Sequence, residues 1–540
     1  MKKNSFMEGA VIATAGIIFV KIIGLIYVIP FNSIIGEKGG ALYGYAYNIY
    51  MLFLSISSAG FPFAISKLTS EYNALGYKKA IKDTYSIATK LILLISFIIF
   101  ILLFIFAPQI GHLIIGDSTG GNTIEDIAFV IRMVSFAILI VPFLSVSKGF
   151  LQGHKYIKPT TDSQVIEQVV RVIIILVGSY AALKIFHTDL KVAVGIAVSG
   201  AFFGGFVAYL FLRRKITKSN LLKEKADDKE HVTKKEIIRK IIGYSVPFII
   251  VSLIYNLYNT VDMILVSRTM SDILHISMKQ VESVLSVFTT WGVKLNNILL
   301  AVTTGLTTSL IPNIVASFTK KDMKDVDSKF NKALQCTLLI IVPATIFLSL
   351  LVKPVWTLFY GNSTYGPIVY KMFVYTALFG GLHSVVVNTL QGLSKYKLVI
   401  ISVLTGLIIN TVCDVPFMLI SHKLGFDVSY GAIVAAMFGY TVSMVIALTI
   451  LHKKYHFSFI DTKKKLPNYI LSIIVFVIVI LLLKILVPTN LTGRMVQIPI
   501  LLVYGIVSFG IYFVINYLNG NLSSLFNIKK GLKNENRNCN

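Results

Sequence analysis

Leu151-Gln-Gly-His-Lys-Tyr156 recurs in the second half of the chain as Leu390-Gln-Gly-Leu-Ser-Lys-Tyr396, 239 residues later. Two further pairs follow the same order at offsets of 250 and 246 residues, namely Phe61-Pro62 with Ile311-Pro312 and Pro108 with Pro354. Three matches in one order indicate an internal duplication. Each copy lies at or just after the end of an apolar stretch, so the repeated unit is predicted to be a set of membrane-spanning helices.

The composition indicates a polytopic membrane protein. Of the 540 residues 55% are hydrophobic and 14% are charged, whereas average soluble proteins are about 25% charged. Fourteen stretches are long enough to cross about 30 Å of hydrocarbon as helices. The predicted spans are 8–34, 40–66, 83–107, 124–147, 159–186, 190–212, 241–267, 283–316, 330–352, 366–392, 397–421, 427–451, 466–487 and 495–518.

The distribution of basic residues supports this count. With residues near span ends counted in the adjoining loop, 36 of the 51 Lys and Arg fall on the side predicted to be cytoplasmic, 10 on the outer side and five inside spans. This bias follows the positive-inside rule and predicts a plasma-membrane protein with both termini in the cytoplasm. The net charge of +26 is therefore mainly a topology signal. We expect contact with the lipid bilayer and no binding of nucleic acid.

One long polar segment, Arg213 to Lys240, separates spans 6 and 7. The predicted domains are a six-helix lobe at 1–213, a basic cytoplasmic linker at 214–240, a second six-helix lobe at 241–452, helices 13 and 14 at 453–520, and a cytoplasmic tail at 521–540. The fold class is thus all-α, with 14 transmembrane helices in two lobes plus two C-terminal helices. Because six spans separate equivalent positions, the repeats are parallel, and the cargo path is expected near the membrane midplane between the lobes.

Five basic residues fall inside the spans: Lys21, Lys90, Arg132, Arg171 and Lys294. A charge at this depth costs about 2.5–3.5 kcal/mol on insertion scales, so such residues usually face the interior of the bundle. Basic residues there favour an anionic cargo. The long side chains of Lys90 and Arg132, closer to their span ends, could instead reach the interface.

Span 5 carries the densest set of polar residues. Gln164, Glu167 and Arg171 recur at steps of three and four residues, so they share one helix face. Glu167 and Arg171 can pair as i and i+4. Two interpretations stay open: the pair packs two helices, or Arg171 contacts cargo.

Lys294 in span 8 has no acidic residue on its own helix face. In span 7, Asn259 and Asp262 lie on one face. Asp262 either neutralises Lys294 across the helix interface or positions it for cargo.

Span 11 holds Asn410 and Asp414, which are candidates for binding a coupling cation or for hydrogen bonds between helices. The sequence contains no Gly-rich phosphate loop with its Lys and no cluster of His residues. We therefore expect no enzymatic activity and no cofactor, with membrane potential or a monovalent cation as the driving force.

Lys158-Pro-Thr-Thr-Asp-Ser-Gln-Val-Ile-Glu-Gln-Val-Val-Arg171 resembles the signature of the bacterial polysaccharide-transporter branch of the multidrug/oligosaccharidyl-lipid/polysaccharide (MOP) exporter superfamily. Ala59-Gly-Phe-Pro62, Ala64-Ile-Ser-Lys67 and Leu151-Gln-Gly153 match it as well. Within that branch the chain is most similar to the Gram-positive lipid II flippase group, which includes stage V sporulation protein B.

The resemblance implies a V-shaped bundle that moves an undecaprenyl-pyrophosphate-linked peptidoglycan precursor outward. It also implies a cationic cavity for the pyrophosphate, with Lys21 and Lys294 as the matching residues, and a groove for the polyprenyl tail at spans 13 and 14. One position departs from the family, because Tyr27 is followed by Val28 where a basic residue is frequent. This departure limits the transfer of residue roles around span 1.

Three alternatives remain at this point. A flippase for another lipid-linked saccharide would need the same cavity. A cation-coupled drug exporter on the same fold would need acidic rather than basic residues there. A scaffold for cell-wall synthesis enzymes would need docking surface, which the short loops hardly provide outside 213–240.

Overall fold

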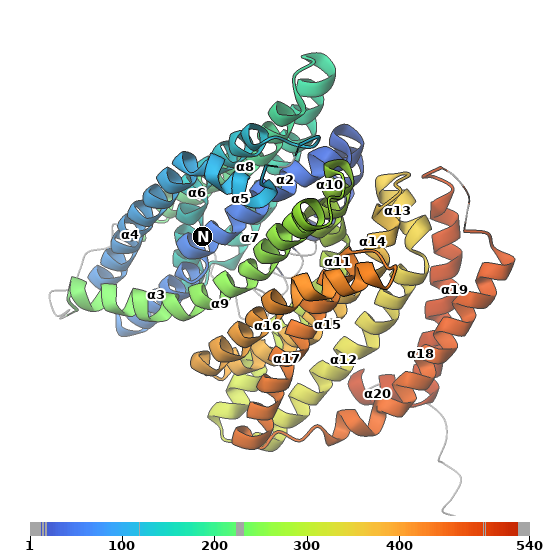
Figure 1. Ribbon diagram of the computed structural model, residues 1–540. Coiled ribbons are helices and arrows are strands. Elements are labelled where there is room, and N and C mark those ends of the chain that lie inside the picture. Colours follow the sequence, from blue (N-terminus) through green and yellow to red (C-terminus); the bar gives the residue numbers. More distant parts are fainter. Residues whose placement is uncertain are drawn as a thin grey trace, which may run out of the picture. The chain divides into compact units, whose positions relative to one another are not determined.

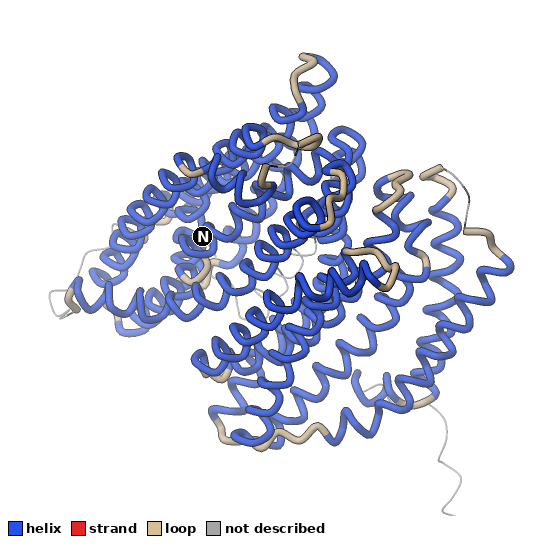
Figure 2. The backbone as a smooth tube through the Cα atoms, in the orientation of Figure 1, coloured by secondary structure: helices blue, strands red, loops and turns tan. Residues whose placement is uncertain are grey.

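The structure is a computed structural model that describes residues 12, 16, 19–117, 119–222, 232–489, 491 and 493–526. Throughout these residues the regular secondary structure is helical and contains no strand (Figure 1, Figure 2). Thirteen of the described helical segments are long and apolar enough to cross a membrane. The predicted all-α membrane fold is therefore confirmed, and the count of fourteen agrees approximately.

The difference in the count arises at the first two predicted spans. The predicted span 8–34 begins outside the described residues, and its end continues into helix α2, Val28–Ser58. Gly36 interrupts α2 with φ 64° and ψ −164°, a conformation that residues with a Cβ rarely adopt. Two predicted spans therefore join at a kinked glycine, and α3, Phe61–Leu75, follows after a short bend.

The remaining helices follow the predicted spans closely. In the first half they are α4 Lys78–Ile105, α5 Ala107–Ile115, α6 Ile124–Gly153, α7 Ile157–Ile173, α8 Leu190–Lys218, α9 Lys234–Arg268, α10 Met278–Ser286 and α11 Gly292–Thr319. In the second half they are α12 Met323–Leu350, α13 Val352–Tyr360, α14 Gly366–Phe373, α15 Tyr375–Gly392, α16 Tyr396–Lys423, α17 Ser429–Tyr455, α18 Ile460–Leu486, α19 Gln497–Leu518 and α20 Asn521–Phe526.

The sequence repeat is also a repeat of backbone geometry. After α6, Lys155 has φ 65° and its N–H donates to Gln152 O at 2.9 Å. After α15, Ser394 has φ 59° and its N–H donates to Gln391 O at 2.9 Å. The two turns are 239 residues apart, as the motif is in the sequence, so both copies end a helix in the same way.

Packing divides the chain into two compact units. The first contains 1–295 and 407–436, and the second contains 296–406 and 437–540. These limits differ from those of the lobes at 1–213 and 241–452, which were derived from the repeat and the polar linker and stay a prediction. Residues 223–231 of that linker and 527–540 of the tail lie outside the described residues.

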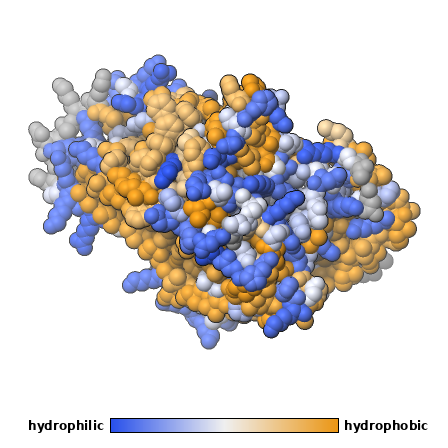
Figure 3. Space-filling view, turned by 45° about the horizontal axis from the view of Figure 1, so that its top comes forward, coloured by the Kyte–Doolittle hydropathy of each residue, from blue (hydrophilic) through white to orange (hydrophobic). Residues whose placement is uncertain are grey.

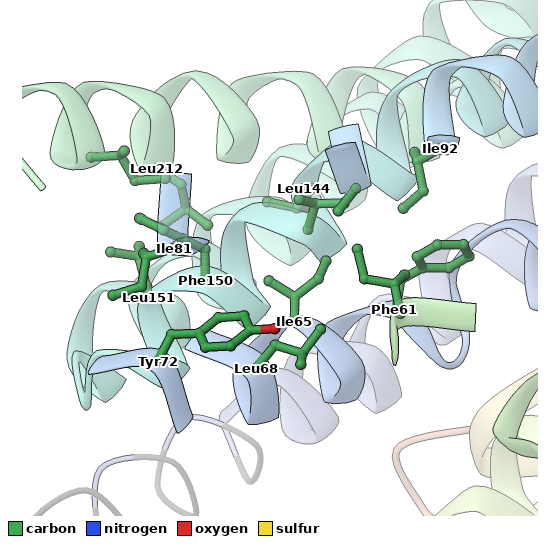
Figure 4. Packing of buried hydrophobic residues seen from close by; sticks show 14 of the residues in the cluster. Phe61, Ile65, Leu68, Tyr72, Ile81, Ile92, Leu144, Phe150, Leu151 and Leu212 are labelled. Atoms are coloured by element: carbon green, nitrogen blue, oxygen red, sulfur yellow. The ribbon is translucent and has the colours of Figure 1, made fainter. Parts of the chain in front are cut away.

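A buried hydrophobic cluster joins α3, α4, α6, α8 and α9 in the first unit (Figure 4). The cluster includes Phe61, Ile65 and Leu68 of α3, Phe150 of α6 and Leu212 of α8. Apolar residues also cover broad areas of the outer surface (Figure 3). Lipid is as apolar as these side chains, so helix association here depends on close packing.

Gly149 of α6 provides one such close contact, because a Cβ added there would lie 2.5 Å from Pro62 O. We expect Gly149→Ala to lower the free energy of unfolding by about 1–3 kcal/mol through overpacking, measured as a lower thermal midpoint in detergent. Gly243→Ala is the control, because nothing lies within 4 Å of its added Cβ. An equal loss in both variants would contradict the packing argument.

Candidate functional site

The ammonium group of Lys294, in α11, makes cation–π contacts with two tyrosine rings. Its Nζ is 5.4 Å from the ring centroid of Tyr27 and 5.9 Å from that of Tyr47. The side chain is half-buried and forms no ion pair with any described carboxylate. Cation–π contacts of this kind stabilise a charge without neutralising it. Lys294 is therefore held by two aromatic rings and not by a described carboxylate.

Lys21 adds a second positive charge close to the first. It is exposed on the helix that precedes α2, and it is near enough to Lys294 for the two charges to repel. Neither lysine has a described carboxylate partner. Two like charges that repel in a poorly screened environment favour an anion between them.

The tyrosines of α2 form a wall beside Lys294. Tyr43 and Tyr47 stack with centroids 5.4 Å apart, and Tyr47 and Tyr50 follow at 5.6 Å. Their spacing of four and three residues puts all three on one helix face. Tyr43 and Tyr50 are buried and Tyr47 is half-buried. We call Tyr43, Tyr47 and Tyr50 the tyrosine wall.

Glu167 of α7 holds two cations at once. Its Oε1 accepts from Arg171 Nη2 at 2.6 Å, and its Oε2 accepts from Lys148 Nζ at 3.0 Å. The three side chains are only 16–19% exposed. One carboxylate cannot neutralise two cations, so the cluster keeps one net positive charge. Arg171 is also within electrostatic range of the tyrosine wall.

Lys148 was absent from the residues predicted from the sequence. The predicted span ended at 147, which assigned Lys148 to the cytoplasmic loop, but α6 continues to Gly153. The i,i+4 pairing of Glu167 with Arg171 was foreseen as one of two interpretations. The pair exists, and Lys148 shares its carboxylate.

A separate cluster contains the acids of α9 and α16. Asn410 Nδ2 donates to Asp262 Oδ1 at 2.6 Å, so Asp262 contacts α16 and not Lys294. The side chains of Asn410 and Asp414 are fully buried. Both carboxylate oxygens of Asp414, and Asn410 Oδ1, lack a donor among the described residues. Asp262 and Asp414 are close enough to hydrogen-bond if one carries a proton.

The other predicted residues lie elsewhere or lack contacts that define a role. Arg132 donates from Nε to Phe104 O at 3.1 Å and lies against the Phe104 ring, so it is held by α4. Gln164 is half-buried on α7, and Asn259 is exposed on α9. Lys90 is exposed on α4. The structure therefore brings Lys294 and Arg171 to the tyrosine wall and Lys21 near Lys294, and Arg132 contacts α4.

This arrangement can bind an amphipathic anion. Lysine and arginine side chains bind phosphate through charge-assisted hydrogen bonds, and tyrosine offers an apolar ring with a polar hydroxyl. The pair of the half-buried Asp262 and the fully buried Asp414 can accept a cation or a proton. Among the described residues, no group of three or more His, Cys, Asp or Glu side chains could hold a metal ion.

Comparison with known proteins identifies a family and a relative that this chain resembles. The polysaccharide biosynthesis protein family matches residues 6–275. Lipid II flippase MurJ of Bacillus subtilis (strain 168) is 31% identical over 481 residues, which cover 87% of each chain.

Two solved structures share the fold. One, a lipid II flippase MurJ in an inward closed conformation, superposes with a TM-score of 0.69 at 16% identity and covers 94% of this chain and 99% of its own. The other, an inward-facing multidrug resistance MATE family transporter of the MOP superfamily, has a TM-score of 0.60 at 14% identity and covers 85% and 98%. At these identities the superpositions establish the fold alone.

Glu167→Gln tests the three-residue cluster. Removing the carboxylate leaves Lys148 and Arg171 facing each other, so we expect a loss of roughly 3–5 kcal/mol in stability, measured from unfolding midpoints in detergent. Lys148→Gln should cost less, because the Arg171–Glu167 pair remains. If Lys148→Gln destabilises as much as Glu167→Gln, the carboxylate does not balance two cations.

Proposed function

The chain belongs to the polysaccharide biosynthesis protein family, and from this premise we propose that it is a lipid II flippase of the polysaccharide-transporter branch of the MOP exporter superfamily. In this proposal it moves the undecaprenyl-pyrophosphate-linked peptidoglycan precursor from the inner to the outer leaflet of a bacterial plasma membrane by alternating access. Its similarity to transporters solved in inward closed and inward-facing conformations supports the mechanism.

The observation that carries the proposal is the set of contacts that Lys294 makes. Its ammonium contacts Tyr27 and Tyr47 and has no described carboxylate partner. A positive charge kept unneutralised at membrane depth is costly, and an anionic cargo offsets that cost. Lys21 and the net-positive cluster at Glu167 add charge of the same sign. The pyrophosphate would bind to these cations, and the tyrosine wall would contact the attached sugars.

The positions and contacts of the acidic side chains disfavour the alternative that the protein exports organic cations as drugs. Such an exporter needs a carboxylate that faces its cargo. Glu167 is occupied by Lys148 and Arg171, and Asp414 is fully buried beside Asp262. A flippase for a different polyprenyl-linked saccharide would use the same cations, so the sugar is identified only by a transport assay with defined lipids.

We further propose that Asp262, Asn410 and Asp414 couple transport to a monovalent cation or a proton. The support is the set of buried oxygens without donors, two on Asp414 and one on Asn410. Two neighbouring carboxylates cannot both stay ionised without a counter-charge. A bound cation or proton would supply that charge, and its release would change the packing of α9 against α16.

Lys294→Gln tests the cargo site. We expect the variant to fail to complement a strain depleted of its lipid II flippase, because the unpaired charge is lost. Lys294→Arg should restore growth in part, since it keeps the charge. Lys90→Gln is the matched control, as Lys90 is an exposed in-span lysine on α4. Normal growth with membrane-inserted Lys294→Gln would refute the role of Lys294.

Asp414→Asn tests the coupling site. In proteoliposomes with lipid II, wild-type transport should rise with an imposed sodium or proton gradient, and the variant should lose this dependence while still binding cargo. Asp117→Asn is the control, because the Asp117 side chain is 94% exposed. If the variant responds to the same gradient as the wild type, the coupling ion binds elsewhere.

A further inference from the structure

A polar pocket of about 220 Å³ lies between the N-terminal parts of α12 and α18, in the second unit. Three lysines line it, Lys332, Lys464 and Lys465, together with the carboxylate of Asp461. Three ammonium groups against one carboxylate leave the pocket positively charged. None of these residues belongs to the cargo site or to the coupling site.

Buried amides hold the walls of this pocket in place. Asn331 Nδ2 donates to Ser458 O at 2.8 Å, and Asn331 Oδ1 accepts from Thr462 Oγ1 at 2.6 Å. Gln335 Oε1 accepts from Lys465 Nζ at 2.9 Å. Asn331 and Gln335 are 1% and 2% exposed. The pocket is therefore a preformed feature of the α12–α18 contact, and Lys332 and Lys464 are exposed at its rim.

The pocket lies where the apolar surface of α18 begins. Leu466, Ile470 and Leu471 of α18 are 42–53% exposed, as expected of side chains that face lipid. Lys464 and Lys465 directly precede them in the sequence, and α18 runs beside α19 (Figure 1). The charge distribution predicts that this end of α18 lies at the cytoplasmic surface. A ligand with an anionic head and acyl chains would fit this combination of features.

We propose that this pocket binds the phosphate headgroup of an anionic phospholipid of the inner leaflet. Lys332 and Lys464 contact the phosphate oxygens, and the acyl chains lie along the exposed apolar side chains of α18. Basic pockets between helices on the cytoplasmic side are suited to such headgroups. Free phosphate and the pyrophosphate of a polyprenyl lipid share the same anionic chemistry, so the experiment separates these sources.

The test measures lipid binding by the purified full-length chain with native mass spectrometry, comparing phosphatidylglycerol with phosphatidylcholine. The variant K332Q/K464Q removes the two rim lysines and leaves the Lys465–Gln335 bond intact. We expect its affinity for phosphatidylglycerol to fall on the order of tenfold, with no change for phosphatidylcholine. An unchanged unfolding midpoint shows that the variant is folded.

K324Q/K463Q is the matched control. It also removes one exposed lysine from α12 and one from α18, and neither residue lines the pocket. This control should bind phosphatidylglycerol as the wild type does. An equal loss in both variants, or no loss in K332Q/K464Q, overturns the proposal.

Two competition arms identify the source of the phosphate. Millimolar inorganic phosphate should not displace phosphatidylglycerol from the wild-type chain, and displacement would point to a free anion instead. Undecaprenyl pyrophosphate should bind K332Q/K464Q as it binds the wild type. If its binding falls more than that of phosphatidylglycerol, the pocket belongs to the cargo route, and the lipid proposal fails.

Discussion

The cost of keeping a charge away from water determines how this bundle is organised. Every charged group at membrane depth must find a partner or face a ligand, and the described residues use three solutions. Glu167 binds two cations, Asp262 binds an amide and a second acid, and Lys294 contacts only tyrosine rings. Among these three, Lys294 is the one without a described carboxylate or amide partner, and for this reason the proposed cargo site is built on it.

Tyr27 and the tyrosine wall allow Lys294 to lie in the bundle without a carboxylate partner. A lysine beside a carboxylate would be neutralised, and a lysine in hydrocarbon would be too costly. The rings of Tyr27 and Tyr47 give the ammonium a weak electrostatic partner that an incoming anion can outcompete, since a cation–π contact contributes about 0.5–2 kcal/mol. The same wall is close to Arg171, so it links the two basic parts of the site.

Much of the fold could be predicted from the sequence, because span length and loop charge respond directly to the bilayer. The helices α6, α8 and α16 begin within one residue of their predicted spans, and α6 and α8 continue six residues past the predicted ends. The kink at Gly36, where two helical segments meet, could not be foreseen, because a glycine permits such a backbone conformation without requiring it. Lys148 was missed for a related reason, because a helix can continue past the apolar stretch when its polar residues find partners such as Glu167.

The choice of partners was the least predictable part of the site. Helical spacing identifies which residues share a face, as for Glu167 and Arg171, but it does not identify the helix across the interface. Asp262 was therefore considered as a partner of Lys294, whereas in the structure its carboxylate accepts a hydrogen bond from Asn410.

The repeat suggests why the two polar clusters differ in sign. The turns before α7 and α16 match at an offset of 239 residues, and the same offset relates Arg171 to Asn410 and Glu167 to Gly406. Equivalent helices thus carry polar groups at equivalent positions: α7 presents the Glu167–Arg171 pair, which becomes net positive only with Lys148 of α6, and α16 presents Asn410, with Asp414 one turn later. One duplicated helix therefore contributes to a basic cluster and the other carries an acid, which is the arrangement that the proposed coupling of an anionic cargo to a cation would require.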